Sequence, residues 1–387
     1  MVQSKLPNTN KSIFSSVYSL IEETGALDMA IGKSDFATPQ ALVDLAVEYM
    51  KSGDHNYAPL EGIAKLRKVI SDLVEENYGN RYNPKTEVTV SASIVQAVHT
   101  AISAVVRDDD EVIVFEPAFE SYVPSIILNG GKPVYMELKA PGFTIDWEEL
   151  RKMITTKTKM IILNSPHNPT GSVLSEADMM QLQRLTNGTN IIILSDESFE
   201  SIVFDNQVHQ SIARYEKLID RSFIVSSFGA VYNINGWGIA YCLAPEKLMI
   251  EYRKMQQFQL CNVNTPMQYA LAEYIPHHHY FDDVSALYQG KRNYFLRLLE
   301  NSLYKFIPTQ GSYFQLIDYS RLSDDSDQIF IDRLARDFGI AVVPVSAFYH
   351  EKTKAKLLRV CFAKENDKLE KAASLLLSVP SMIVEDL

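Results

Sequence analysis

The chain has 387 residues, of which 46% are hydrophobic and 22% charged, so it is long enough to bury a large core and has the composition of a globular protein. Its formal net charge of −11 argues against a nucleic-acid or anionic-membrane surface, because both carry negative charge themselves. We therefore expect a small-molecule substrate as partner, and neither a nucleic acid nor a membrane.

Cysteine content and the N-terminal segment indicate the compartment. The three cysteines, Cys242, Cys261 and Cys361, are too few and too scattered for a disulfide framework. The segment MVQSKLPNTNKSIF lacks the apolar core of a signal peptide, and no window approaches the roughly 18 uninterrupted apolar residues of a membrane span. We expect a cytoplasmic protein.

Apolar periodicity and turn residues predict the elements of the first part of the chain. Helices are expected over residues 13–23, from Thr38 to Met50 with a proline in the first turn, and over 96–106. Extended segments are expected over 27–32, 87–91 and 111–115, the last as a continuous apolar run typical of a buried strand.

Further strands and helices alternate along the rest of the chain. Apolar runs predict strands, and amphipathic stretches predict helices, at these positions: strands 160–163, 191–194, 223–225, 312–316, 340–344 and 358–362; helices 245–255, 284–299 and a last one after Lys364. The alternation between about 87 and 243 predicts a doubly wound, mostly parallel sheet. Its site is expected at the carboxyl ends of the strands.

Three short motifs identify a family. Residues 226–229 read SSFG and are followed by Gly236-Trp237, residues 164–171 read NSPHNPTG, and residues 195–197 read SDE. Together they resemble the fold-type I, class I/II aminotransferases of the methionine and kynurenine subgroup, which use pyridoxal phosphate (PLP). The resemblance spans nearly the whole chain.

The resemblance implies the PLP-transferase fold type I, an α/β fold. A doubly wound, mostly parallel sheet would form a large domain from residues 46–279. Residues 1–45, with an N-terminal arm, and 280–387 would form a smaller α+β domain.

The same resemblance implies the residues around PLP. Phe119 would stack on the pyridine ring, Asn168 would hydrogen-bond the ring hydroxyl, and Asp196 would pair with the pyridinium nitrogen, which makes the ring an electron sink. Ser227, in the SSFG segment, occupies another cofactor-binding position of the family.

Two further positions concern the partner subunit and the substrate. Tyr57 lies in a segment similar to the family's Y-x-P-x-x-G, where the tyrosine reaches the PLP phosphate of the neighbouring subunit, and so it implies a homodimer. Arg359 is, by resemblance, the arginine that holds the α-carboxylate of an amino-acid substrate in a bidentate contact.

The chain departs from the family where the cofactor is held. The family's Schiff-base lysine falls on Ala230, its next residue, threonine, on Val231, and its phosphate-binding basic residue on Gly238. A methyl group cannot form the Schiff base, and glycine carries no charge for the phosphate. Ile94 replaces a small residue and Val95 a hydroxyl-bearing one, so their β-branched side chains could fill the place of the phosphate.

These departures lie far apart in sequence but all map to the family's pocket. Local rules broken together at one site usually indicate function, so they favour a rebuilt pocket, an engineered de novo active site. We expect no bound cofactor, although PLP serves the parent family, and we do not expect native transamination. The substrate-binding residues of the rebuilt pocket would be Ile94, Val95, Ala230, Val231, Gly238 and Arg359.

Three hypotheses for the function remain open. In the first, Lys33 lies in the pocket as a desolvated amine that forms a Schiff base with a carbonyl substrate, as in aldol or retro-aldol chemistry. Cys261 is an alternative nucleophile, although a single cysteine is more often an apolar filler. The second is an inactive or residual PLP-binding aminotransferase, and the third is a non-catalytic small-molecule binder.

The sequence predicts no metal site. His277, His278 and His279 are consecutive, and on a helix three consecutive side chains point in different directions, so they would not converge on one ion.

Overall fold

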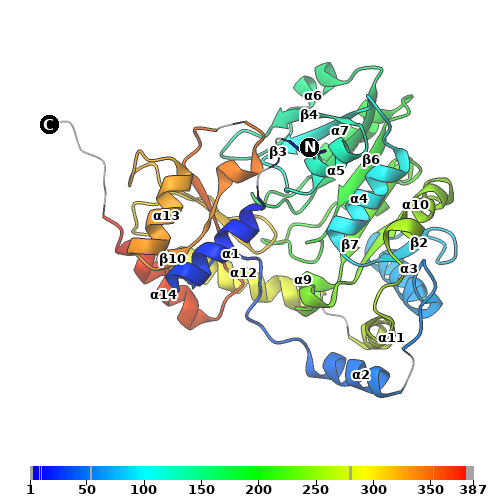
Figure 1. Ribbon diagram of the computed structural model, residues 1–387, viewed down its shortest axis with the longest axis horizontal. Helices are drawn as coiled ribbons and strands as arrows, with labels where there is room; N and C mark the ends of the chain where they lie inside the picture. The colour runs from blue at the N-terminus through cyan, green and yellow to red at the C-terminus, as the bar shows by residue number, and fades with distance from the viewer. Residues whose placement is uncertain are drawn as a thin grey trace.

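The computed structural model describes residues 3–7, 9, 11–52, 55–278, 281–351 and 353–380. Its largest element is a seven-stranded sheet (Figure 1). In sheet order, the strands are β2 (Val88–Ser91), β8 (Ala240–Leu243), β7 (Ser222–Ser227), β6 (Ile192–Asp196), β5 (Thr158–Asn164), β3 (Glu111–Glu116) and β4 (Lys132–Glu137). Strand β8 is antiparallel to both neighbours and the other pairs are parallel, which confirms the predicted mostly parallel sheet.

The central strands are buried on both faces, as their continuous apolar runs predict. Along β3, Val112 and Val114 enter one core while Ile113 and Phe115 enter another, because successive side chains of a strand point to opposite faces. Helices α4 (Ile94–Val105), α5 (Tyr122–Leu128) and α10 (Glu246–Gln259) contribute to the first of these cores.

A second sheet is built from the C-terminal third. Its strands run in the order β11 (Val343–Pro344), β12 (Leu357–Cys361) and β9 (Phe314–Asp318), all antiparallel. The helices in this part of the chain are α12 (Phe281–Leu298), α13 (Asp327–Asp337) and α14 (Asn366–Leu377).

The N-terminal arm joins this second part. Strand β1 (Leu27–Asp28) pairs in parallel with β10 (Ile340–Ala341), and helix α1 (Ile13–Thr24) lies beside α13 (Figure 1). The pairing agrees with an arm that belongs to the smaller domain, while the domain limits given above remain a prediction.

The remaining helices lie between these strands along the chain. They are α2 (Gln40–Lys51), α3 (Ala64–Tyr78), α6 (Trp147–Met153), α7 (Glu176–Thr186), α8 (Glu216–Ile219), α9 (Gly229–Tyr232) and α11 (Thr265–Tyr274). Within the described ranges, no helix combines the length and the apolarity that crossing a membrane requires. His279 lies outside the described residues.

One predicted strand is wrong in detail. The segment 340–344 forms two short strands, β10 and β11, because Val342 separates a pairing with β1 from a pairing with β12. The chain therefore passes from one sheet to the next within five residues, which ties the N-terminal arm closely to Arg359 on β12.

Candidate functional site

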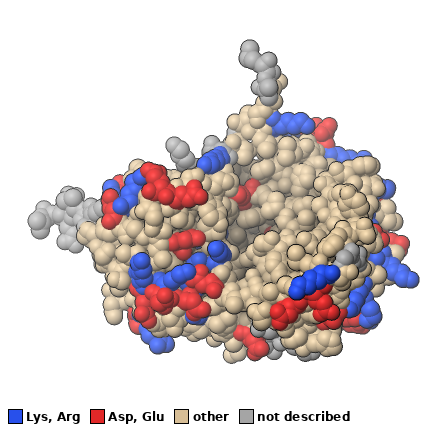
Figure 2. All heavy atoms as spheres, turned by 60° about the horizontal axis from the view of Figure 1, so that its bottom comes forward, with Lys and Arg blue, Asp and Glu red and all other residues tan. Residues whose placement is uncertain are grey.

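A cavity of about 280 Å³ lies at the carboxyl edge of the large sheet. Asn164, Asp196 and Ser227 are the last residues of β5, β6 and β7, and all three line it. Phe314 on β9 and Arg359 on β12 line it from the second sheet. Figure 2 shows a hollow near the centre of one face of the molecule. The cavity thus lies between the two sheets, where the strand order predicts a binding site.

Four of the lining residues form what we call the polar side: Asn164, Asn168, Asp196 and Arg359. Hydrogen bonds connect them in a chain. Arg359 Nη1 donates to Asn168 Oδ1 (2.8 Å), the Asn168 backbone N–H donates to Asn164 Oδ1 (2.8 Å), and Asn164 Nδ2 donates to the Asp196 carbonyl (2.9 Å). The side chains of Arg359, Asn168 and Asn164 are therefore each held by another member of the group, and Asp196 takes part through its backbone carbonyl.

Asp196 is a buried carboxylate that is hydrogen-bonded by two residues, Tyr122 and Ser198. It accepts hydrogen bonds from the Tyr122 hydroxyl (2.7 Å), from the Ser198 backbone N–H (3.1 Å) and from the Ser198 hydroxyl. Burial raises the pKa of Asp196 because it penalises the charged form, and the bonds from Ser198 and Tyr122 oppose that rise.

Arg359 is fully buried and is among the largest side chains of the described residues for which this is true. Its Nη2 donates to the Ala30 carbonyl (2.8 Å), whereas its Nε has no hydrogen-bond partner. Burial lowers the pKa of Arg359 to about 10, so the guanidinium keeps its charge at neutral pH. A buried, charged donor without an acceptor is costly, and it marks a place where an anion would be stabilised.

The opposite lining, which we call the apolar side, consists of Ile94, Val95, Ala230 and Ile239. Helix α4 begins here because Ser93 caps it, its hydroxyl accepting from the Gln96 N–H at 3.1 Å. No hydrogen bond of a side chain fixes this group, which holds its shape by packing alone.

Gly238 precedes the apolar side in a left-handed turn, at φ +65°. A Cβ atom at this position would lie 2.9 Å from the carbonyl oxygen of Ala92. Both the backbone conformation and this close approach therefore disfavour any side chain at residue 238.

The charges around the cavity are few. Among the described residues that line it, Arg359 is the one cation and Asp196 the one carboxylate, and none is a lysine.

The cavity brings together eight of the residues that the sequence singled out. They are Ile94, Val95, Phe119, Asn168, Asp196, Ser227, Ala230 and Arg359. Their roles in binding remain predictions, but their convergence on one cavity does not depend on any assumed role.

The expected placement of Lys33 in the cavity is wrong. Its side chain is exposed and is not part of the lining, whereas the preceding residue, Gly32, does line the cavity. The Lys33 N–H donates to the Ile31 carbonyl (2.7 Å), and Lys364 Nζ donates to the Lys33 carbonyl (2.9 Å). This tight turn directs Gly32 inward and the lysine outward.

Four other singled-out residues also lie outside the lining. Val231 is buried in the main core, because only Gly229 and Ala230 of the short helix α9 lie along the cavity. Gly238 belongs to the turn described above. Cys261 is exposed, and Tyr57 is 80% exposed on the surface.

Several lining residues were not singled out from the sequence. Phe14, Phe199, Tyr313, Phe314 and Asn235 all line the cavity. Phe14 and the segment 313–314 come from the two ends of the chain, and only their folding together brings these aromatic residues to one place.

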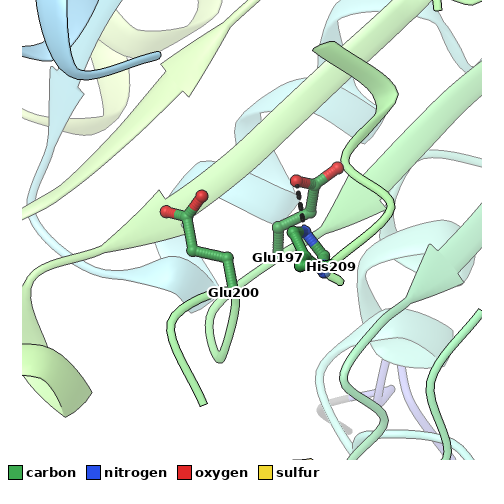
Figure 3. A group of neighbouring side chains, drawn as sticks. All are labelled: Glu197, Glu200 and His209. Carbon is green, nitrogen blue, oxygen red and sulfur yellow. Dashed lines mark hydrogen bonds and ion pairs between the residues drawn. The ribbon is translucent and has the colours of Figure 1, made fainter. Parts of the chain in front are cut away.

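A second buried polar cluster lies next to the site. Glu197, Glu200 and His209 have ligand atoms within 4.8 Å of one another, and Figure 3 shows the contact between Glu197 and His209. It is the one group of described residues whose positions would allow a metal ion.

Protein donors already occupy the carboxylates of this cluster. Glu197 accepts from Ser195, Ile212 N–H and His209 Nε2 (2.8, 3.1 and 2.9 Å). Glu200 accepts from Ser226 (2.6 Å), Tyr241 (2.8 Å) and Tyr78. With every carboxylate oxygen bonded, the cluster is a structural network rather than an open ligand set.

Comparisons with known proteins agree with this geometry. The profile of the family described as aminotransferase class I and II matches residues 24–376. The methionine aminotransferase of Escherichia coli (strain K12) is 37% identical over 374 residues, which are 96% of this chain and 96% of that protein. Human kynurenine–oxoglutarate transaminase 1 is 28% identical, with 91% of this chain and 92% of that protein covered.

Solved structures show the same fold. The Escherichia coli protein YbdL, described with a methionine aminotransferase function, has a TM-score of 0.94 at 36% identity, covering 97% of this chain and 99% of that one. N-succinyldiaminopimelate aminotransferase from Mycobacterium tuberculosis also has a TM-score of 0.94, at 28% identity, covering 98% and 100%. The predicted fold is confirmed.

Proposed function

Because this chain belongs to the aminotransferase class I and II family, we propose that it uses the family's cavity to bind a small carboxylate without catalysing transamination. One observation carries the proposal: the cavity has its cation, Arg359, whereas none of its described lining residues is a lysine. The first feature supports binding, and the second supports the loss of the family's reaction.

Transamination with PLP needs a lysine amine that forms a Schiff base and then moves protons. By resemblance, the position of that lysine is Ala230, which lines the cavity with a side chain that ends at Cβ. A methyl group can neither attack a carbonyl nor carry a proton. Ala230 therefore supports the loss of transamination in this chain.

When bound, PLP supplies the family's electron sink through its pyridine ring. In this cavity its phosphate also lacks a cationic partner. The turn at Gly238 disfavours a side chain, and Ile94 and Val95 stand at the N-terminus of α4, where the family receives the phosphate. The lining residues thus do not fit PLP as a retained cofactor, because they offer neither an amine for its aldehyde nor a cation for its phosphate, and the proposed function does not depend on it. We also propose that the apolar side was rebuilt by engineering, because the residues that depart from the family are grouped at this one site.

A ligand of matching chemistry would have a carboxylate and an apolar body. The Arg359 guanidinium would bind the carboxylate by charge-assisted hydrogen bonds. Asp196 would accept from a donor such as an ammonium group, and the aromatic lining, including Phe119, Phe199 and Tyr313, would pack against the body of the ligand. Small amino or keto acids with apolar side chains meet these requirements, and L-methionine is a suitable probe because a relative is named for it.

Calorimetric titration with L-methionine and with its keto acid tests the proposal. We expect saturable binding to the native protein. The affinity of Arg359→Met should be lower by about tenfold or more, because a hydrogen bond to a charged group is lost. Arg107→Met, which removes an exposed arginine, is the matched control. Equal affinity in the native protein and Arg359→Met, or keto-acid production from methionine, would refute the proposal.

No observation favours amine catalysis. That hypothesis requires desolvation of Lys33, and an exposed side chain does not provide it. A catalytic role for Lys33 therefore stays an untested prediction with the geometry against it.

The homodimer is likewise a proposal. Tyr57, Val95 and Phe258 are 80, 48 and 86% exposed, which is unusual for large apolar side chains, and Val95 also lines the cavity. A second copy of the chain would cover such a surface. Sedimentation velocity at micromolar concentration would contradict this if it gave a monomer.

A further inference from the structure

The cation of the cavity is sealed by three aromatic rings. The Arg359 guanidinium carbon lies 3.9 Å from the ring centroid of Phe314, 5.2 Å from that of Phe14 and 5.4 Å from that of Phe348. Arg359 is therefore fully buried although it lines the cavity, and its unpaired Nε is out of reach of solvent. Displacement of any one of these three rings would therefore widen access from the cavity to the guanidinium.

Two of the walls are fixed by the fold. Phe314 and Phe348 are each 3% exposed. Phe314 begins β9 and pairs with Cys361 of β12, so it belongs to the same sheet as Arg359. The Phe348 carbonyl accepts from the Ala118 N–H at 2.7 Å, which ties this wall to the segment that follows β3 of the large sheet.

Phe14 is the third wall and has fewer ties. It lies in the first turn of α1, is only partly buried, and also lines the cavity. Its ring contacts Phe119 and Phe348 at centroid distances of 6.3 and 6.4 Å. The first turn of a helix is the part that opens most readily, because its N–H groups have no partners within the helix.

One carboxylate holds this first turn closed. Glu120 Oε1 accepts from the Ser12 hydroxyl at 2.7 Å, and Glu120 Oε2 accepts from the Ile13 N–H at 3.3 Å. Helix α1 has no acidic residue in its own first turn and no side-chain cap, so Glu120 supplies the acceptor from a distant part of the sequence. Glu120 also follows Phe119, which lines the cavity.

We propose that Phe14 is a gate over Arg359, which the contact of Glu120 with Ser12 and Ile13 holds shut, and which opens when the first turn of α1 loosens. Phe14 is then a specificity-determining residue. A ligand must displace the Phe14 ring to reach Arg359, and it must be small enough for the ring to return afterwards. The consequence for ligands rests on the proposed function, whereas the gate itself does not.

The accessibility of Arg359 tests the gate without any ligand. The full-length protein is treated with phenylglyoxal, which modifies arginine, and the labelled residues are followed by peptide mapping. In the native protein we expect Arg359 to react far more slowly than Arg107, which is exposed. In Glu120→Ala the labelling of Arg359 should be about tenfold faster, since two hydrogen bonds are lost, both to the partly exposed Glu120 carboxylate.

Phe14→Ala removes the ring itself and should accelerate labelling at least as much. Glu22→Ala is the matched control, because Glu22 is an exposed acid on the same helix, and it should label like the native protein. Arg292, which is buried elsewhere, should keep its native rate in every variant.

Three results would overturn the gate. They are fast labelling of Arg359 in the native protein, unchanged labelling in both Glu120→Ala and Phe14→Ala, and equal acceleration at Arg292, which would indicate general loosening. The predicted labelling without any calorimetric heat would keep the gate and refute carboxylate binding. Calorimetric binding that depends on Arg359, together with fast labelling of Arg359 in the native protein, would support carboxylate binding and refute the gate.

Discussion

The polar and apolar sides of the cavity are built in different ways. On the polar side, hydrogen bonds connect Arg359 to Asn168, Asn168 to Asn164 and Asn164 to the Asp196 carbonyl, so truncating Arg359 or Asn164 leaves a polar partner unsatisfied. On the apolar side, side chains such as Ile94 and Ala230 contribute only packing. A change there costs the fold little as long as the volume fits.

If the proposed function is correct, this difference explains how an aminotransferase fold can lose its reaction and remain folded. The groups that would carry the covalent chemistry belong to the apolar side, where the scaffold does not require them. The groups that would hold a carboxylate belong to the polar side, where the scaffold does. The comparison predicts that the apolar side tolerates a new functional group, whereas the polar side is sensitive to protonation and truncation.

The largest expected effect is a gain of chemistry on the apolar side. Ala230→Lys places an amine in the cavity, because Ala230 lines it. With excess PLP followed by borohydride, we expect a reduced pyridoxyl group on the lysine at residue 230, which peptide mapping detects by mass. Schiff-base formation needs only an amine within reach of the aldehyde.

Ala230→Met is the matched control, since it adds a chain of similar length without an amine. A lysine at residue 230 that stays unlabelled while the protein remains folded would show that the cavity does not admit PLP at all. The apolar side would then be closed rather than merely unreactive.

A smaller effect is expected from acid on the polar side. His167 belongs to the loop that carries Asn168, and its Nδ1 lies 2.7 Å from the Thr170 hydroxyl. Burial lowers the pKa of His167 from 6.5 to about 4, so the neutral form is favoured in the folded state. The associated stability is fully present above pH 6.5 and is lost as the pH falls towards 4, by roughly 3 kcal/mol in total.

Urea unfolding of the native protein and of His167→Gln, compared at several pH values, measures this effect. The advantage of the native protein over the variant should shrink on acidification through that window. Burial raises the pKa of Asp196 and Glu200, and these groups act with the opposite sign in both proteins, so the difference isolates His167. Parallel pH profiles would contradict the assignment.

The smallest effect is expected at Lys33. Because its side chain is exposed, Lys33→Met should leave both L-methionine binding and borohydride trapping with a carbonyl substrate unchanged. Loss of a trapped adduct in this variant would restore the amine-catalyst hypothesis.

The sequence predicted the large sheet well because its central strands are continuous apolar runs. Strand β4 was not predicted, since it lies at the edge of the sheet and three of its residues are only half-buried, which removes the apolar run. The loop 164–171 was placed correctly because its motif follows directly on a strand that was recognised.

The cavity was predicted in part for a related reason. Asp196 and Ser227 end strands, so their positions follow from the sheet. Phe14 and the outward turn of Lys33 depend instead on how the N-terminal arm packs against β9 and β12, and such a contact between the two ends of the chain leaves no local pattern.

Nuclear magnetic resonance of L-methionine labelled with carbon-13 in its methyl group tests the central claim most directly, because it reports binding and turnover together. The native protein is mixed with the labelled amino acid, 2-oxoglutarate and PLP. We predict that the methyl signal of methionine broadens when native protein is added and stays narrow with Arg359→Met. No signal of the keto acid should appear over time. A growing keto-acid signal would contradict the claim that this protein does not catalyse transamination. A methyl line that stays sharp with the native protein would contradict the claim that it binds the carboxylate.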